Sequence, residues 1–428
     1  MLKRYTKETV PELLTLLNRR ASDLPGEILQ TVGDVLRDVR ENGDEALRRY
    51  TERFDKVTLS SFYLDPSEIE KAEAQLSPAL KDAMSRAAVN IRAFHEKQLT
   101  GGVTIEKGNI RMGQRILPLR RVGLYVPGGR AAYPSSVLMN AIPAKVAGVE
   151  EIIMATPPKA GEGINPAVLY AAKLAGVTQI LTVGGAQAVA ALAYGTESVK
   201  RVDKIVGPGN IFVATAKRLV FGSVDIDMIA GPSEVLVIAD ESADPAYIAA
   251  DLMAQAEHDP MAAALLVTTS SDMADRVCEE LKKQIMTLPR REIIEKSLAS
   301  CGSAVIVDTL DEAAELSDVI APEHLELCVT DPEAMLAKVR NAGSVFLGSF
   351  TPEPLGDYYA GPNHVLPTGG TARFSSSLCT DSFRKRSTFL SYDKDSLLAA
   401  SEDVMTFAEA EGLTAHANSI RVRGGSRK

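Results

Sequence analysis

Hydrophobic positions follow two different patterns along the chain, and the change falls near residue 100. In residues 25–54 and 66–98, apolar side chains recur every three to four positions among many charges, which predicts amphipathic helices. Short strands are expected within residues 103–129, and beyond them apolar runs alternate with helical stretches. This alternation predicts parallel strands joined by crossover helices, an α/β fold. The apolar runs lie at residues 150–158, 178–185, 202–210, 233–240, 262–269, 303–309 and 343–349.

A short internal repeat supports this reading. AKVAGVEEIIMAT begins at residue 144 and AKLAGVTQILTVG at residue 172, and each ends a helix at a glycine before an apolar strand. We therefore expect two Rossmann-like lobes with parallel-rich sheets, divided at the glycine-proline break AGPSEV. The expected divisions are a helical region at 1–120, lobes at 121–232 and 233–378, and a helical tail at 379–428 with no strand able to join a sheet.

Composition excludes several classes of protein. The chain has 428 residues, of which 45% are hydrophobic, and a formal net charge of −9. This length predicts two to three globular domains. Because lysines and arginines are interspersed with acids, we expect no nucleic-acid-binding surface. The first residues lack the apolar core of an export signal, and the uncharged stretch 174–196 is too polar for a membrane span, so a cytoplasmic protein is expected.

Cysteine usage restricts the kinds of metal site. The chain has four cysteines, widely spaced and without a CxxC pair. This pattern favours reduced thiols over a disulfide framework or a cysteine-rich zinc site. Any metal would therefore depend on nitrogen and oxygen ligands.

Glycine-rich turns follow three of the predicted strands, at residues 124–130, 182–188 and 205–210. The loops after parallel strands commonly carry ligands, and Gly184 leads into a helix whose first amides could hold a phosphate. Their polar side chains are Tyr125, Gln187 and Asn210. None of the turns matches GxGxxG, so tight turns without a cofactor explain these glycines equally well.

Gln255 and His258 form the first candidate metal chelate. They lie three residues apart near the end of the helical stretch that Pro260 should stop, so both side chains can face one atom. The alternative is a polar helix face with an end-capping histidine. Glutamine is an unusual zinc ligand, which weakens the metal hypothesis when this pair is taken alone.

A second candidate site is APEHLEL at residues 321–327. Pro322 suits a first helical turn, which would place Glu323 and His324 near the positive end of a short helix. A neutral histidine beside an ionised glutamate is a usable general base. A packed histidine after an acidic helix start is the alternative. Cys328 follows in what reads as a buried strand, which argues against a nucleophile.

Two further segments supply possible ligands. Asp357 lies in a turn-rich loop, and EGLTAH brings Glu411 and His416 together across a glycine that stops a helix. Gln255, His258, Asp357 and His416 would leave Zn²⁺ with a net positive charge, suited to acidifying a substrate hydroxyl. Spacing alone does not show that the four meet, and His364 is a rival ligand.

Eight motifs taken together resemble the histidinol dehydrogenase family, in order and over nearly the whole chain. They are GLYVPGG, VGGAQAVAALAYGT, VGPGN, AGPSEVLVIAD, QAEH, APEHLEL, GDYYAGPNHVLPT and EGLTAHANSIRVR. The resemblance implies oxidation of L-histidinol to L-histidine through L-histidinaldehyde in two NAD⁺-dependent steps, the end of histidine biosynthesis. It also implies one zinc ion per active site, an incomplete Rossmann fold without GxGxxG, and a homodimer whose carboxy-terminal segments cross over.

The family's functional residues have matching residue types at every position in this chain. The resemblance implies zinc ligands Gln255, His258, Asp357 and His416, and acid/base residues Glu323 and His324. It implies substrate contacts at Ser233, Gln255, His258, His324, Asp357, Glu411 and His416, and NAD contacts at Tyr125, Gln187 and Asn210.

These residues suggest a division of labour between the two oxidation steps. We expect His324 to take the hydroxyl proton in the first step and Glu323 to activate water for hydration of the aldehyde in the second. Acidic side chains suit a substrate with an amine and an imidazole, and an amino alcohol can chelate zinc. Two rivals remain at this point: a zinc hydrolase that does not use NAD⁺, and a non-catalytic NAD-binding scaffold.

Overall fold

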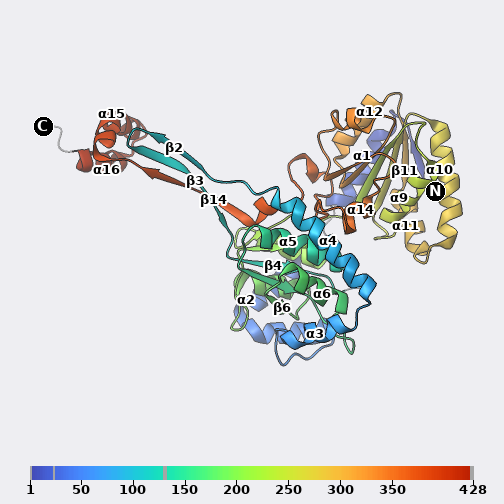
Figure 1. The fold of residues 1–428 in the computed structure, drawn as a ribbon, viewed down its shortest axis with the longest axis horizontal. Coiled ribbons are helices and arrows are strands. Elements are labelled where there is room, and N and C mark those ends of the chain that lie inside the picture. Colours follow the sequence, from blue (N-terminus) through green and yellow to red (C-terminus); the bar gives the residue numbers. More distant parts are fainter. Residues whose placement is uncertain (1, 23–24, 129–132, 425–428) are drawn as a thin grey trace. The chain divides into compact units, whose positions relative to one another are not determined.

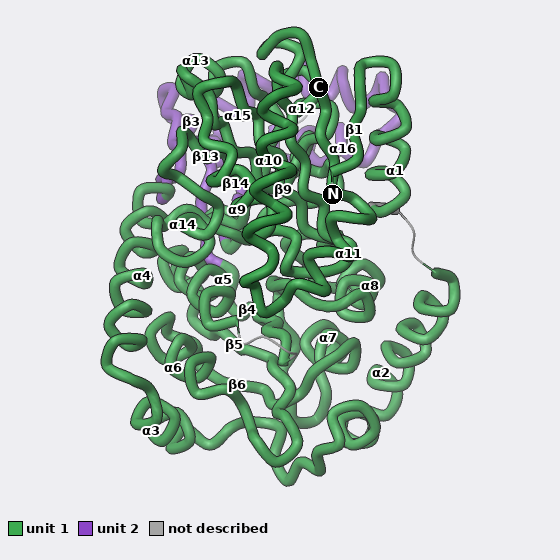
Figure 2. Tube along the Cα trace, turned by 90° about the vertical axis from the view of Figure 1, so that its right-hand side faces the viewer, with its two compact units in different colours: residues 1–98, 119–383 green, residues 99–118, 384–428 purple. Residues whose placement is uncertain are grey.

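The computed structural model describes residues 2–22, 25–128 and 133–424. The chain divides into two compact units, which Figure 2 distinguishes by colour. Unit 1 comprises Met1–Gln98 and Leu119–Phe383, and unit 2 comprises Leu99–Pro118 and Arg384–Lys428. Each unit is thus assembled from two separate stretches of the chain.

Unit 1 contains a five-stranded parallel sheet in the order β6-β5-β4-β7-β8. Two of its strands, β4 and β6, are labelled in Figure 1. Its strands are β4 (Arg121–Tyr125), β5 (Glu151–Ala155), β6 (Gln179–Leu181), β7 (Lys204–Val206) and β8 (Asp225–Ile226). The crossover helices are α5 (Pro134–Val146), α6 (Pro166–Ala175), α7 (Gly185–Tyr194) and α8 (Ile211–Val220). Both faces of the sheet are covered, because Ile152 and Met154 pack into one hydrophobic cluster and Ile153 into another.

The predicted repeat is confirmed in this sheet. The two copies correspond to the end of α5 followed by β5 and the end of α6 followed by β6. Gly148 and Gly176 have φ angles of 93° and 80°, the left-handed conformation that ends a helix and that glycine adopts without steric cost. The two glycines therefore turn the chain from helix into strand.

A second, six-stranded parallel sheet has the order β1-β11-β10-β9-β12-β13. Its strands are β1 (Lys3–Tyr5), β9 (Glu234–Ala239), β10 (Ala263–Thr268), β11 (Ser303–Ile306), β12 (His324–Cys328) and β13 (Ser344–Leu347). Its helices are α1 (Val10–Ser22), α9 (Pro245–Ala256), α10 (Ser271–Gln284), α11 (Arg291–Cys301), α12 (Leu310–Ile320), α13 (Pro332–Leu336) and α14 (Glu353–Tyr358), with the 3₁₀ turn η1 (Ile285–Thr287). The predicted α/β fold with parallel-rich sheets is confirmed. The Rossmann-like character and the four domain boundaries stay predictions.

The amino-terminal part of unit 1 is mainly helical, as predicted. It contains α1, α2 (Gly26–Asp55), α3 (Pro66–Ala74) and α4 (Pro78–Glu96). It also contains β1, which the hydrophobic pattern did not indicate, because three residues at a sheet edge are too few to show a periodicity. None of the helices among the described residues is long and apolar enough to cross a membrane.

Unit 2 is a three-stranded antiparallel sheet with two helices. The sheet has the order β14-β3-β2, from β2 (Val103–Lys107), β3 (Ile110–Pro118) and β14 (Arg384–Ser391). The helices α15 (Lys394–Ala410) and α16 (Thr414–Gly424) are separated by Gly412, whose φ is 73°. The expectation of a tail without a sheet-forming strand was wrong. None of the residues of β14 is buried in this chain, so the strand lacks the apolar alternation that marks a strand in sequence.

The core of the six-stranded sheet should be sensitive to cavities. Leu236 lies fully buried in the central strand β9. We expect Leu236→Ala to lower the free energy of unfolding by roughly 2–5 kcal/mol, because the surrounding side chains cannot fill the space. Urea unfolding monitored by circular dichroism measures the loss. The control Val319→Ala removes a 59%-exposed side chain and should change stability by less than about 0.5 kcal/mol. Equal effects of the two changes would contradict this packing.

The second prediction concerns Cys328, which is buried in β12. Burial, together with the nearby carboxyl groups of Glu326 and Asp251, raises the pKa of the Cys328 thiol to about 12. Thiolate is the reactive form, so at about pH 8 only a fraction on the order of 10⁻⁴ of Cys328 can react. Peptide mapping after iodoacetamide treatment of the folded protein should show modification of the half-buried Cys278 and Cys379 well before Cys328. Labelling of Cys328 at the rate of a free cysteine would overturn this prediction.

Candidate active site

The amino ends of two adjacent strands hold the predicted acid/base residues. β9 starts at Glu234 and β12 at His324, and His324 lies in register with Val235. The Glu234 N–H donates to Glu323 Oε2 at 3.0 Å, and the Glu234 carbonyl oxygen lies 3.1 Å from His324 Nδ1. The backbone of Glu234 therefore contacts both predicted acid/base side chains.

The predicted helical setting of Glu323 and His324 was wrong. α12 ends at Ile320, Ala321 takes a left-handed conformation with φ 50°, and the chain then enters β12. Every residue of β12 is buried, with β9 on one side and β13 on the other. A strand flanked on both sides gains ladder hydrogen bonds and apolar burial that a short exposed helix at Pro322 could not provide.

Gln255 and His258 lie at the carboxyl end of α9. The helix ends at Ala256, and the His258 N–H still donates to the Gln255 carbonyl oxygen at 3.2 Å in the following turn. Gln255 is completely buried whereas His258 is exposed. The alternative of a solvent-facing polar helix surface therefore does not describe Gln255.

The orientation of the Gln255 amide follows from its surroundings. One end of the amide faces the Glu234 carbonyl oxygen at 3.3 Å and Glu353 Oε2 at 3.2 Å, so we assign this end as the nitrogen. His324 Nδ1 lies 3.1 Å from this nitrogen and 3.1 Å from the Glu234 carbonyl oxygen. Because a carbonyl oxygen can only accept, we assign the imidazole hydrogen to Nδ1, which donates to Glu234 and does not accept from Gln255. The amide oxygen of Gln255 is left to accept from another group.

This tautomer leaves the other nitrogen of His324 with a lone pair. His324 Nε2 is buried and has no hydrogen-bond partner among the described residues, and Asp357 Oδ1 lies 3.9 Å away. Burial lowers the pKa of His324 to about 4, so the imidazole is neutral near neutral pH. An unprotonated Nε2 surrounded by acidic side chains could accept a proton from a group that binds beside it.

Glu353 is a member of the site that the sequence analysis missed. Ligand atoms of His258, Glu353 and Asp357 all lie within 4.8 Å of one another, a spacing that could hold a metal ion. Glu353 and Asp357 are four residues apart on α14, so they share a helix face. The i, i+4 spacing in EPLGD could have identified this helix, but the many turn-forming residues nearby suggested a loop.

Burial also controls the protonation of the glutamates. It raises the pKa of Glu323 to about 8 and that of Glu353 well above its usual range. The charge of Asp357 acts on both in the same direction. The site is thus short of positive charge, and a cation entering it would favour the ionised carboxylates.

The segment after α14 fixes Asp357 and the rival ligand His364. His364 Nδ1 donates to the Asp357 carbonyl oxygen at 3.0 Å, and it also lies 3.8 Å from Asp357 Oδ1. The neighbouring Asn363 donates to the Met139 carbonyl oxygen at 2.6 Å and contacts His95 Nε2 at 3.2 Å. His95 is therefore a buried packing residue that helps to anchor the segment after α14.

The amino-terminal helix α1 reaches this site through Arg20. Its buried guanidinium pairs with the Glu234 carboxylate and donates to the carbonyl oxygens of Pro232 at 3.0 Å and Met261 at 2.9 Å. A weaker contact of 3.5 Å joins Arg20 to the carbonyl of Ser233, the predicted substrate contact that directly precedes β9. Arg20 thus holds the start of β9, whose backbone contacts Glu323 and His324.

The predicted NAD residues lie at the carboxyl edge of the five-stranded sheet. Tyr125 ends β4, and its hydroxyl accepts from the Gly185 N–H at 3.0 Å, at the start of α7. Gln187 is buried in the same helix, and its Nε2 has no partner among the described residues. Asn210 follows β7 and caps α8 by accepting from the N–H groups of Phe212 and Val213. In the loop after Tyr125, Gly129 and Arg130 lie outside the described residues.

Glu411 and His416 belong to unit 2, whereas the residues described above belong to unit 1. Glu411 directly follows α15, His416 lies in the first turn of α16, and both side chains are exposed. The predicted glycine stop between them is confirmed by Gly412. Their part in the site stays a prediction.

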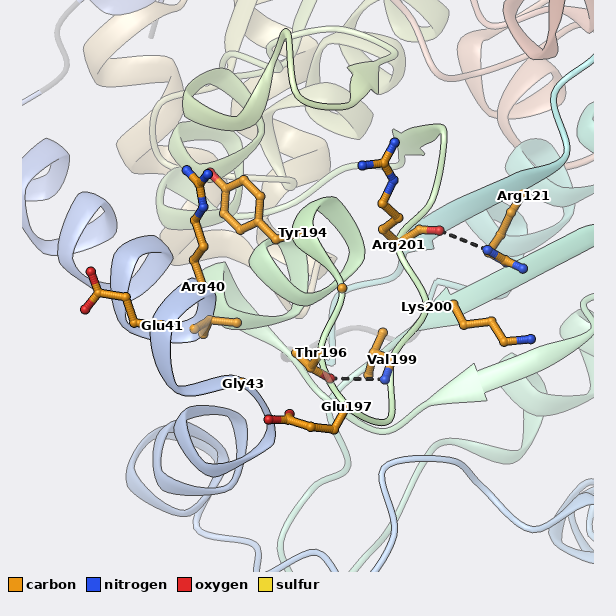
Figure 3. A pocket seen from close by; sticks show the side chains of 12 residues that line it. Arg40, Glu41, Gly43, Arg121, Tyr194, Thr196, Glu197, Val199, Lys200 and Arg201 are labelled. Atoms are coloured by element: carbon orange, nitrogen blue, oxygen red, sulfur yellow. Dashed lines mark hydrogen bonds between the residues drawn. The ribbon is translucent and has the colours of Figure 1, made fainter.

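A separate hollow in unit 1 is lined by both basic and acidic side chains but contains none of the predicted site residues (Figure 3). Arg121 is already bound to Glu151 and to the Arg201 carbonyl oxygen. Figure 3 shows the Lys200 and Arg201 side chains extending in different directions. The cations therefore do not converge on one ligand position.

Comparisons with known proteins agree with this geometry. A family model described as histidinol dehydrogenase matches residues 17–424. The chain is 54% identical over 408 residues to histidinol dehydrogenase from Clostridium acetobutylicum, with 95% of each chain covered. It is 53% identical over 415 residues to the protein of that name from Lactococcus lactis, with 96% of each covered.

A solved structure is also similar along nearly the whole chain. The histidinol dehydrogenase from Elizabethkingia anophelis superposes with a TM-score of 0.93 at 38% identity, covering 99% of this chain and 98% of that one. Sequence and structure thus agree over both units. This chain belongs to the histidinol dehydrogenase family.

Proposed function

We propose that this chain oxidises L-histidinol to L-histidine through L-histidinaldehyde, using two NAD⁺ and one zinc ion per active site. The observation that carries the proposal is the buried Nε2 of His324, which lies near Asp357 and has no hydrogen-bond partner in the part of the chain that the structure describes, in a chain of this family. The nearby carboxylates suit a substrate that carries an amine and an imidazole. Oxidation of an amino alcohol requires a base for the hydroxyl proton, atoms that bind a metal ion, and acidic side chains near the amine.

The donor set of unit 1 fits a zinc ion. Gln255 supplies an amide oxygen, His258 an imidazole and Asp357 a carboxylate, and the close spacing of His258, Glu353 and Asp357 leaves room for a shared cation. The Glu353 carboxylate would accept a hydrogen bond from the Gln255 amide nitrogen. This bond would keep the amide oxygen directed away from Glu353. When bound, zinc would hold the amino alcohol and acidify its hydroxyl, and NAD⁺ would accept hydride.

We propose that the fourth zinc ligand, His416, comes from a second copy of the chain. The family pattern assigns zinc to His416 and substrate to Glu411, and both are exposed in unit 2. A homodimer that exchanges its carboxy-terminal segments would let each copy complete the other's active site. The exposure of both side chains in a single chain is consistent with such an exchange.

The residues of this chain divide the proton transfers of the reaction. His324 Nε2 accepts the substrate hydroxyl proton, while the Glu234 carbonyl fixes the ring through Nδ1. Glu323 is held by the Glu234 N–H and, once ionised, takes a proton from the water that hydrates the aldehyde. Because Glu323 and His324 are adjacent, one bound substrate can meet both groups without release of the reactive aldehyde.

The cofactor is proposed to bind along the edge that carries Tyr125, Gln187 and Asn210. The buried Gln187 Nε2 lacks a partner among the described residues, and a ligand carbonyl or phosphate oxygen would satisfy it. The first amides of α7 lie beside it and favour an anion. Gly128 and Gly184 both pack against Pro157, and a side chain at either position would collide with it.

Product stoichiometry tests the overall proposal. We expect two NADH for each L-histidinol consumed, because oxidation of an alcohol to a carboxylate removes four electrons. Absorbance of NADH combined with quantification of L-histidine measures the ratio. Removal of zinc with a chelator should abolish NADH formation, and addition of zinc should restore it. Formation of a hydrolysis product without NADH would favour the zinc hydrolase, and NAD⁺ binding without turnover would favour the scaffold.

Single substitutions test the two acid/base roles. We expect His324→Asn to lower the rate of histidinol oxidation by about 10²–10⁴-fold while zinc is retained, because asparagine cannot accept the proton. Glu323→Gln should instead slow the oxidation of histidinaldehyde and spare the first hydride transfer. Single-turnover kinetics with each substrate, alongside metal analysis, separates the steps. Near-normal turnover of both substrates by His324→Asn would rule out its assignment.

A further inference from the structure

A buried ion pair in unit 1 lies beneath the loop that carries Asn210. Lys217 of α8 pairs with Asp227, which follows β8, and their side chains are only 3% and 1% exposed. Neither residue belongs to the predicted site.

Both ends of the pair bind the same glycine. The Lys217 ammonium donates to the Gly207 carbonyl oxygen at 2.9 Å, and Asp227 Oδ2 accepts from the Gly207 N–H at 2.7 Å. Gly207 begins the turn Gly207–Asn210 directly after β7. The two charged side chains therefore fix both hydrogen-bonding groups of the first residue of this loop.

The glycine held in this way is also packed tightly against Tyr125. Its φ is 107°, a conformation that L side chains rarely adopt, and a Cβ at this position would collide with the Tyr125 carbonyl oxygen. The Tyr125 hydroxyl in turn accepts from the Gly185 N–H at the start of the helix that carries Gln187. Gly207 thus contacts Tyr125 directly, reaches the helix of Gln187 through the Tyr125 hydroxyl, and lies in the same turn as Asn210.

Stability alone is a weak explanation for this ion pair. Removing two charges from water costs free energy that their attraction often only balances, and apolar replacements of buried pairs are frequently neutral or stabilising. What apolar residues could not reproduce is the simultaneous hold on the Gly207 N–H and carbonyl groups. A loop fixed before binding loses less conformational freedom when the ligand arrives.

We propose that Lys217 and Asp227 are positioning residues that pre-form the Gly207–Asn210 loop for NAD⁺. The inference rests on the proposed NAD⁺ site at Tyr125, Gln187 and Asn210. It adds two residues that act through Gly207 without touching the cofactor. Their effect should fall on NAD⁺ affinity and leave the zinc and histidinol site unchanged.

The chain offers a matched control on the same two strands. Lys204 starts β7 and Asp225 starts β8, and they form an ion pair of 2.9 Å at the opposite ends of these strands. Lys204 is 9% exposed in its side chain, so this pair is also partly buried. Among the described residues, Gly207 is held by Asp227 and Lys217 and not by this pair, so removal of the pair tests the loss of a nearby charge pair without the loss of the loop anchor.

The experiment compares Lys217→Met/Asp227→Asn with Lys204→Met/Asp225→Asn in the zinc-loaded protein. Isothermal titration without histidinol gives the dissociation constant of NAD⁺, and a separate titration gives that of histidinol. We expect the first double variant to weaken NAD⁺ binding by about tenfold or more, with unchanged histidinol affinity and zinc content. The control variant should bind NAD⁺ like the parent.

Each other outcome has a defined meaning. Unchanged NAD⁺ affinity in the first double variant overturns the inference, and so does equal weakening in the control or an equal loss of histidinol affinity. If the double variant does not fold, Lys217→Met decides by the same criteria, because it removes the donor to the Gly207 carbonyl oxygen while Asp227 still accepts from the Gly207 N–H. A parent protein that binds no NAD⁺ contradicts the proposed function itself, which distinguishes the two failures.

Discussion

The hydrogen bonds made by the Glu234 backbone are the interaction on which the candidate active site depends. The N–H group holds Glu323, and the carbonyl oxygen holds His324 and lies next to the Gln255 amide. These bonds exist because β9 and β12 are parallel neighbours whose first residues meet at one edge of the sheet. A side-chain arrangement set by backbone pairing is as rigid as the sheet itself, which suits the proposed placement of two proton acceptors next to one substrate.

Burial of so many acids gives the site its electrostatic character. Desolvation raises the pKa of Glu323, Glu353, Glu326 and Glu234 in the free chain, while Arg20 is the cation that pairs with Glu234. Unpaired buried carboxylates are costly, so a protein retains them where an incoming ligand supplies the missing positive charge. A divalent metal and a cationic amino alcohol would both do so. The same low-polarity surroundings keep His324 neutral and able to accept a proton.

Sequence patterns gave the architecture more readily than the local setting of the site. The alternation of apolar runs predicted the parallel sheets, and the glycines of the repeat predicted where helices give way to strands. β14 was not predicted, because a strand that pairs without being buried has no periodic pattern of apolar residues. The strand that begins at His324 was predicted as a helix, because Pro322 suits both the start of a helix and the entry to a strand. The contact of Arg20 with Glu234 joins residues 214 positions apart, which no local pattern reports. The Lys217–Asp227 pair depends on how α8 and the end of β8 pack around Gly207, which the hydrophobic periodicity does not show either. The predicted site residues themselves came mainly from the family resemblance.

The position of the first residues has a consequence for the order in which the chain can fold. β1 pairs with β11, and Arg20 binds the start of β9, so segments at opposite ends of a long stretch of chain must meet. Closing loops of this length is entropically expensive and slow. During synthesis, the amino-terminal segment leaves the ribosome long before either partner exists. β1 and Arg20 therefore reach their native contacts late, and the six-stranded sheet, with the edge that carries Glu323 and His324, can form completely only after most of unit 1 has been translated.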